Sequence, residues 1–134
     1  MKRFIYFLIV VFAILPGLSV TAYAHHSFTA TYDTRKIVTI EGKVTQFLLR
    51  NPHSFLHVTV VDKEGKEQNW NIEWAAAGQL GGAGVTRDSL KVGDPVVITG
   101  NPARDSADQR LRMVTVKRTS DGFNWGFRQG QVVE

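Results

Sequence analysis

Short segments in which apolar and polar residues alternate recur along the chain, and they limit its fold more than any other feature of the sequence. In the first segment, residues 37–46, Ile40 and Val44 share one parity, whereas Glu41 and Lys43 share the other. Alternation with a period of two places one set of side chains on each face of a β-strand. The other segments that we interpret as strands are residues 54–62, 66–74, 95–99 and 111–118. The chain is therefore predicted to be mainly β.

The order of these segments favours a small barrel. Residues 75–90 interrupt the strand pattern between the third and fourth strands, and residues 78–84 within them are interpreted either as a short helix or as a glycine-rich loop. This order is typical of the oligonucleotide/oligosaccharide-binding (OB) barrel, whereas an immunoglobulin-like sandwich would need about seven strands. We predict an all-β fold, a five-stranded OB-like barrel with a short helix or loop between strands 3 and 4.

The parity of each strand predicts which side chains form the core. The apolar residues expected to be buried are Leu56, Val58, Val60, Trp70, Ile72, Val96 and Ile98. The first strand would keep Gln46 on the face of its buried residues, with a bend after it where Phe47 breaks the alternation. In the fifth strand, uninterrupted alternation would place Met113 on one face and Val114 and Val116 on the other.

The first 24 residues have the pattern of a secretion signal. Lys2 and Arg3 supply a positive start, residues 4–15 carry no charge, and Ala22-Tyr23-Ala24 matches an A-x-A cleavage site. This apolar core is shorter than the roughly 20 residues of a transmembrane helix. The predicted divisions are a cleaved signal peptide at residues 1–24, an N-terminal arm at 25–36 and the barrel domain at 37–134. The mature protein would be periplasmic or secreted, without a stable membrane span; the alternative is an uncleaved anchor.

Charge and composition exclude several classes of function. The formal net charge is +4, and Lys2 and Arg3 carry two of those charges, which leaves +2 for the mature chain. Nucleic-acid binders usually concentrate basic residues more strongly on one face, so we expect no nucleic-acid partner. The chain has no cysteine, which excludes disulfides, thiol catalysis and thiolate metal sites.

Several short motifs are spread over the mature sequence. They are Ala24-His25-His26-Ser27-Phe28, Tyr32-Asp33, Glu41-Gly42, Asn51-Pro52-His53, Trp70-Asn71-Ile72-Glu73, Leu90-Lys91-Val92-Gly93-Asp94 and Gly100-Asn101-Pro102-Ala103-Arg104-Asp105. In this combination the chain resembles an uncharacterised family of small exported bacterial proteins, a domain of unknown function. The resemblance implies a periplasmic or secreted β-barrel and no established activity. The chain departs from the family at Leu48-Leu49-Arg50, where an aromatic residue such as tryptophan is expected; any ligand surface that this aromatic serves is altered here.

The four histidines fall in two clusters, His25/His26 and His53/His57, and imidazole is the commonest metal ligand near neutral pH. After cleavage, the terminal amine and the imidazole of His25 could chelate one ion. A third nitrogen from His26, His53 or His57 would give a site suited to Cu(II), and zinc is the other metal considered. His53 and His57 would share a strand face roughly 13 Å apart at about 3.3 Å per residue, too far for one ion unless the strand bends. The alternative is that His25 and His26 only flank the cleavage site and that His53 caps a turn.

Aromatic side chains provide the other candidate site. Phe55, His57, Trp74 and Trp125 are the candidates for a ligand face, because aromatic rings stack on sugars and bases, whereas Trp70 is interpreted as core. No catalytic residues are predicted. Glu73 and the other strand carboxylates are interpreted as solvated, since their spacing does not place them across a cleft, and the Gly-x-Ser-x-Gly nucleophile motif is absent.

The leading hypothesis is thus an exported, non-enzymatic β-barrel module that binds an unidentified small ligand or a periplasmic protein partner. The alternative is a periplasmic copper- or zinc-binding protein that uses the mature N-terminal histidine with nearby histidines.

Overall fold

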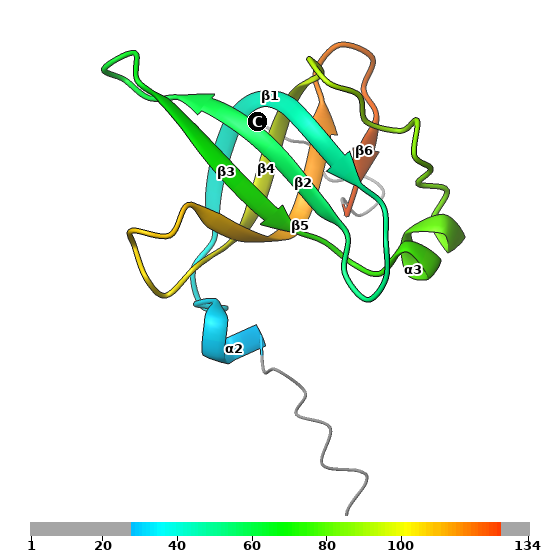
Figure 1. Cartoon of the computed structure of the whole chain (residues 1–134), viewed down its shortest axis with the longest axis horizontal. Coiled ribbons are helices and arrows are strands. Elements are labelled where there is room, and N and C mark those ends of the chain that lie inside the picture. The colour runs from blue at the N-terminus through cyan, green and yellow to red at the C-terminus, as the bar shows by residue number, and fades with distance from the viewer. Residues whose placement is uncertain (1–27, 127–134) are drawn as a thin grey trace, which may run out of the picture.

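The structure is a computed structural model that describes residues 28–126. Within these residues, six strands and two short helices follow one another (Figure 1). The elements are α2 (Phe28–Thr31), β1 (Val38–Leu48), β2 (Phe55–Val61), β3 (Glu67–Glu73), α3 (Ala77–Gly82), β4 (Pro95–Pro102), β5 (Arg110–Arg118) and β6 (Asn124–Trp125). The open question about residues 78–84 is answered by α3, which is a helix.

Five of the strands close into a barrel. β1 pairs antiparallel with β2 on one side and with β4 on the other, β2 pairs with β3, and β4 pairs with β5. A short parallel pairing between β3 and β5 closes the ring. The predicted five-stranded OB-like barrel is therefore confirmed. β6, which the sequence pattern did not predict, adds two residues to the edge of β5.

β1 can pair with two neighbours because it bends. Gly42 lies in the middle of the strand, and a Cβ atom there would lie 2.3 Å from the carbonyl oxygen of Thr59 in β2. The register with β2 then shifts between Val44 and Gln46. The extra residue moves Gln46 to the exposed face and leaves Phe47 packed against the core. The predicted bend is present, but the prediction that Gln46 shares the face of Val44 is wrong.

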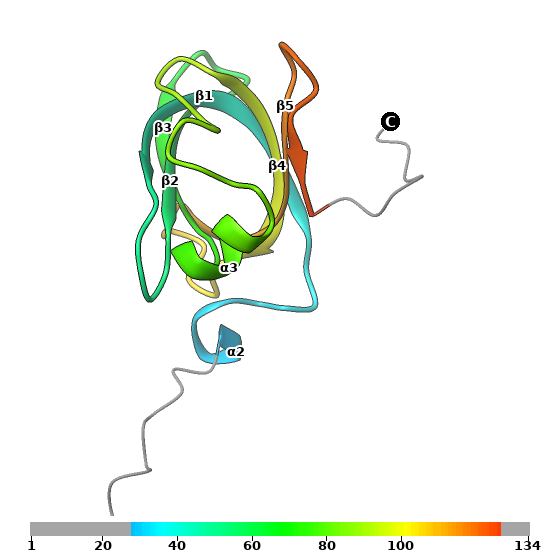
Figure 2. The ribbon, with the colours of Figure 1, turned by 90° about the vertical axis from the view of Figure 1, so that its right-hand side faces the viewer.

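The core lies inside the barrel, as the strand parity predicts. Five of the seven residues expected to be buried have at most 2% of their surface exposed, and Val60 and Trp70 are partly buried against them. One end of the barrel is covered by α3 and the segment after it (Figure 2). Leu80, Val85 and Leu90 of this covering segment belong to the same core cluster.

The predicted face of Val116 is wrong. Thr115 pairs with Thr99 of β4, but Met113 pairs with Gly100, so Val114 is an additional residue in β5. A bulge of this kind adds one residue to the strand, so beyond it the side chains that point inward belong to the other alternate set of residues. Val116 is consequently fully buried, whereas Val114 is exposed.

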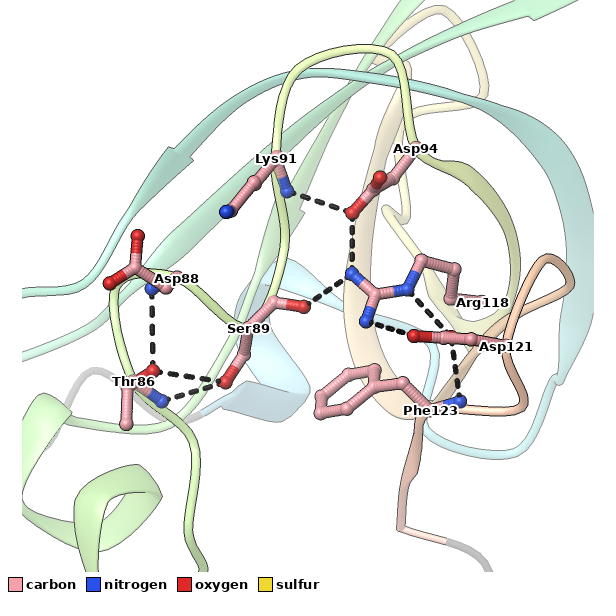
Figure 3. A network of polar contacts seen from close by, with 8 residues as sticks. All are labelled: Thr86, Asp88, Ser89, Lys91, Asp94, Arg118, Asp121 and Phe123. Carbon is pink, nitrogen blue, oxygen red and sulfur yellow. Dashed lines mark hydrogen bonds and ion pairs between the residues drawn. The ribbon is translucent and has the colours of Figure 1, made fainter.

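Arg118, at the end of β5, ties the loops at one end of the barrel together (Figure 3). Its guanidinium donates to the carboxylate of Asp94 at 2.6 Å, to Asp121 at 2.7 and 2.8 Å, and to the carbonyl oxygen of Ser89 at 2.8 Å. The Phe123 ring lies 5.3 Å from the same group. This network connects the segment that covers the barrel with the turn before β6.

Across residues 28–126, no helix has the length and apolar character needed to cross a membrane.

Candidate functional site

A groove of about 310 Å³ lies where the segment before β1, the β1–β2 loop, α3 and β6 meet the ends of β3 and β5. We call it the His53 groove. Its lining residues are Phe28, Pro52, His53, Glu73, Trp74, Ala75, Ala76, Gln79, Arg112, Met113 and Trp125. Six separate segments of the chain thus contribute to one concave surface, which is the usual form of a small-ligand site.

The segment before β1 reaches this groove because it is anchored to the end of β4. Asp33 donates its backbone N–H to Pro102 at 2.9 Å, and Arg104 donates its own to Thr31 at 3.0 Å. Tyr32 between them forms an isolated bridge with Ala103 and is almost completely buried. These contacts place the Tyr32 hydroxyl inside the molecule beside Glu73 at the end of β3.

Glu73 is the centre of a short polar chain at the rim of the groove. The Tyr32 hydroxyl donates to its Oε2 at 2.5 Å, and His53 Nδ1 contacts its Oε1. Only 14% of the Glu73 side chain is exposed. Burial and the hydrogen bond to Glu73 raise the pKa of Tyr32 far above its ordinary value, so Tyr32 stays a protonated donor. The interpretation of Glu73 as a solvated strand residue is wrong, because Tyr32 and His53 cover it.

The contact with Glu73 fixes the tautomer of His53. A carboxylate can only accept, so Nδ1 carries a proton, and in the neutral ring Nε2 then keeps its lone pair. Nε2 has no hydrogen-bond partner in residues 28–126 and is not among their buried unpartnered atoms, so it is reachable from solvent. The Phe28 ring stacks on the imidazole, with the centroids 5.5 Å apart and 21° between the planes. His53 is thereby held from two sides.

Arg112 of β5 supplies a cation to the groove. Its guanidinium carbon lies 3.8 Å from the centre of the Phe28 ring, a cation–π contact. β5 runs parallel to β3 here, and Arg112 is the register partner of Glu73. Within the part of the chain that the structure describes, Arg112 forms no ion pair. Its N–H groups are therefore available to an anion.

Two tryptophans form the apolar wall. Trp74, which follows β3, packs edge-to-face on Trp125 of β6 at 5.2 Å and lies 5.6 Å from Phe47. Trp74 is buried and Trp125 is half-buried. The Trp74 indole Nε1–H is buried without an acceptor among the described residues. Two of the four candidates for a ligand face thus line the groove together.

The other two candidates lie elsewhere. Phe55 and His57 are on the outer face of β2, because their neighbours Leu56 and Val58 point into the core. Arg50 lies 5.0 Å from the centre of the Phe55 ring, and neither Phe55 nor His57 lines the groove. The single ligand face expected from the sequence is therefore divided between the groove and the outer barrel wall.

The candidate metal ligands are divided in the same way. His53 is at the groove, His57 is on the outer face of β2, and His25 and His26 lie outside the described residues. Residues 28–126 contain no group of three histidine, aspartate or glutamate side chains placed to hold an ion.

A second hollow, of about 640 Å³, lies over β1, β2 and β4. Its walls include outward-facing strand residues such as Thr59 and Val97, and the charged residues Glu41, Lys43 and Glu67 also line it. None of the residues that the sequence singles out for ligand or metal binding lines it, so the His53 groove is the stronger candidate.

Sequence reasoning missed three residues of the site: Phe28, Tyr32 and Arg112. The first two carried a signal, because they are aromatic residues in an otherwise polar segment and belong to the motifs of the family resemblance. Nothing local in the sequence marks the contact of Arg112 with Phe28.

Comparison with known proteins identifies a family for the chain but assigns it no role. No curated protein matches the sequence. Among solved structures, the mitochondrial single-stranded DNA binding protein Rim1 of S. cerevisiae has a TM-score of 0.49 at 13% identity, covering 65% of this chain and 96% of its own. The small single-stranded DNA-binding protein of Streptomyces coelicolor has a TM-score of 0.41 at 22% identity, and the match covers 62% of this chain and 93% of that protein. The model of a family of unknown function, DUF6152, matches residues 13–112, and the chain therefore belongs to this family.

Proposed function

We propose that this protein is an exported, non-enzymatic binding module that holds a small organic acid with an aromatic or flat apolar body in the His53 groove. The observation that carries the proposal is Arg112, a cation without an ion-pair partner among the described residues, fixed on Phe28 at the edge of an aromatic groove.

The chemistry of the walls defines the class of ligand. A guanidinium presents a planar set of donors that matches a carboxylate with two parallel hydrogen bonds. Trp74 and Trp125 offer apolar surface for a ring. A volume of about 310 Å³ is at the lower end of the range for ligand pockets, which fits an acid with one or two rings. Glu73 forms no ion pair with Arg112, and its two oxygens contact Tyr32 and His53 instead.

The lining also supports binding rather than covalent chemistry. The described residues that line the groove include no serine, threonine, lysine or tyrosine, so His53 has no hydroxyl or amine nucleophile beside it to activate. An imidazole with a free Nε2 can instead donate to or accept from a bound polar group.

The proposal can be tested by titrating the purified mature protein with benzoate and indole-3-acetate while tryptophan fluorescence is recorded. Benzyl alcohol, which keeps the ring but lacks the carboxylate, is the matched ligand. We expect saturable binding of the acids and at least tenfold weaker binding of the alcohol, since hydrogen bonds to a charged group are worth about 1.5–3 kcal/mol.

Two arginine variants distinguish binding of the acid in the groove from a general effect of removing one positive charge. Arg112→Gln should weaken binding of the acid about tenfold or more, whereas Arg87→Gln should leave it unchanged, because Arg87 is exposed in the loop before β4. Equal affinity for acid and alcohol, or equal effects of the two substitutions, would contradict an anion site at Arg112.

Export is tested separately. Expression of the full chain in a bacterial host, followed by mass spectrometry of the periplasmic fraction, should give a product that begins at His25, since the A-x-A motif ends at Ala24. A product that still carries residues 1–24 would contradict the signal peptide.

A further inference from the structure

We infer that the His53 groove selects aromatic acids that carry a hydroxyl or amine donor on the ring, because Nε2 of His53 is held as a hydrogen-bond acceptor. The inference rests on the proposed binding of an organic acid at Arg112, and it adds the second polar group that such an acid must offer. It makes His53 the residue that determines specificity and Glu73 the residue that positions it.

The orientation of His53 decides what its free nitrogen can do. Glu73 contacts Nδ1 through Oε1, and Tyr32 donates to the other oxygen, Oε2, at 2.5 Å. Only 14% of the Glu73 side chain is exposed, whereas 40% of the His53 side chain is exposed. The carboxylate therefore takes the proton-bearing nitrogen of the neutral ring, and Nε2 presents a lone pair at the groove.

The other polar groups of the groove cannot make the same selection. The guanidinium of Arg112 and the two indole groups are donors only, and both oxygens of Glu73 already have a partner. Among the described lining residues, Gln79 of α3 carries the other side-chain oxygen that a ligand can reach. A primary amide offers a donor as well as an acceptor, so it accommodates either kind of ligand group. His53, whose ring is fixed, distinguishes between them.

The positions of Arg112 and His53 suit the two ends of one ligand. The guanidinium carbon of Arg112 lies 3.8 Å from the centre of the Phe28 ring, and the His53 ring is centred 5.5 Å from the same point. The separation of the two groups cannot exceed the sum of these distances, which is short enough for an acid with a single ring to contact both. A carboxylate at Arg112 and a hydroxyl or amine at His53 are then joined by a flat body against the tryptophan wall.

The test compares ligands that differ only in the donor, with binding to the mature protein measured by isothermal titration calorimetry at pH 8. The ligands 3- and 4-hydroxybenzoate are matched with 3- and 4-methylbenzoate, because a methyl group is close to a hydroxyl in size but cannot donate. At this pH an imidazole is ordinarily neutral and a phenol keeps its proton. At least one hydroxy acid should bind about three- to tenfold more tightly than its methyl partner, the gain expected from one hydrogen bond between neutral groups.

Three variants locate this preference for the hydroxy acid. His53→Phe, which keeps a flat ring beside Phe28 but has no acceptor, should abolish it. Glu73→Gln should reduce it, because an amide can donate to Nδ1 as well as accept from it and so no longer fixes the tautomer. Gln79→Ala, the matched control in the same groove, should leave it unchanged. Since the preference is a ratio of two affinities in one variant, a general loss of stability or affinity does not produce this result.

The outcomes separate this inference from the acid site on which it rests. Equal affinities for hydroxy and methyl acids, or a preference kept in His53→Phe and lost in Gln79→Ala, would overturn the inference and leave the acid site in place. Arg112→Gln should weaken both ligands by a similar factor and keep their ratio. Absence of binding by all four acids would refute the proposed function and this inference with it.

Discussion

Replacement of Gly42 by alanine should destabilise the barrel, because β2 leaves no room for a side chain at this position of β1. A Cβ atom at position 42 would lie 2.3 Å from the carbonyl oxygen of Thr59 and 2.7 Å from Cγ1 of Val58. Both distances are shorter than real Cβ contacts allow. The first of them is to backbone, which cannot rotate away, so β1 and β2 must separate.

The size of the effect follows from two opposing contributions. Overpacking of a closely packed site costs about 1–3 kcal/mol. Replacement of glycine by alanine also restricts the unfolded chain, which recovers about 0.4–1 kcal/mol. We therefore expect Gly42→Ala to lower the free energy of unfolding by about 1–2 kcal/mol. Gly81→Ala is the matched control, because a Cβ at Gly81 would meet no atom within 4 Å and the residue lies in α3; it should raise stability by about 0.5–1 kcal/mol.

Urea unfolding followed by tryptophan fluorescence measures both variants, and the slope of the transition shows whether the denatured state has changed. A Gly42→Ala protein as stable as the wild type would refute the reasoning, since it would mean that β1 can move away from β2 at little cost and that the bend does not depend on glycine.

The remaining predictions concern side chains around the groove and the loops. Tyr32→Phe should lower the free energy of unfolding by about 1.5–3 kcal/mol, measured in urea, because it removes a buried donor from the Glu73 carboxylate; an unchanged midpoint would show that this hydrogen bond contributes nothing. The hydrogen bond from Arg118 lowers the pKa of Asp121, and hydrogen bonds from Lys91 and Arg118 lower that of Asp94 even though burial alone would raise it. An aspartate whose pKa is lower in the folded protein than in the unfolded chain stabilises the fold at pH values above its ordinary pKa of about 4. This stabilisation is lost as the pH falls through the lowered pKa. Thermal unfolding between pH 7 and pH 2 should therefore show a loss at the acid end that is smaller in Arg118→Gln, and parallel curves would contradict the network.

The alternation of apolar and polar residues predicted the strands and most of the core because burial of one sheet face imposes a period of two on the sequence. A bulge adds one residue without changing composition, so its position is not visible in the pattern. For this reason Gln46 and Val116 were assigned to the wrong faces, although the break at Phe47 did indicate the bend in β1. The two-residue strand β6 was missed because so short a segment has no periodicity.

The candidate site was harder to predict than the fold. His53, Trp74 and Trp125 stood out by residue type, but nothing in their spacing indicated that the last two pack against each other. Phe55 and His57 were grouped with Trp74 because all were possible ligand contacts, yet strand parity already placed Phe55 and His57 opposite the core face. The partners that orient His53, namely Glu73 and Phe28, come from segments separated in sequence, and only the folded chain brings them together.

Closure of the barrel explains why the groove has its particular charges. β3 and β5 pair over only three residues each, and the parallel register sets Glu73 beside Arg112. Opposite charges in such a position would ordinarily pair, but Tyr32 and His53 engage both oxygens of Glu73, and Arg112 turns to the Phe28 ring instead. A register slip of one residue would place either side chain on the opposite face of the sheet. The same pairing that completes the core therefore also creates a free guanidinium and an oriented imidazole at the mouth of one groove.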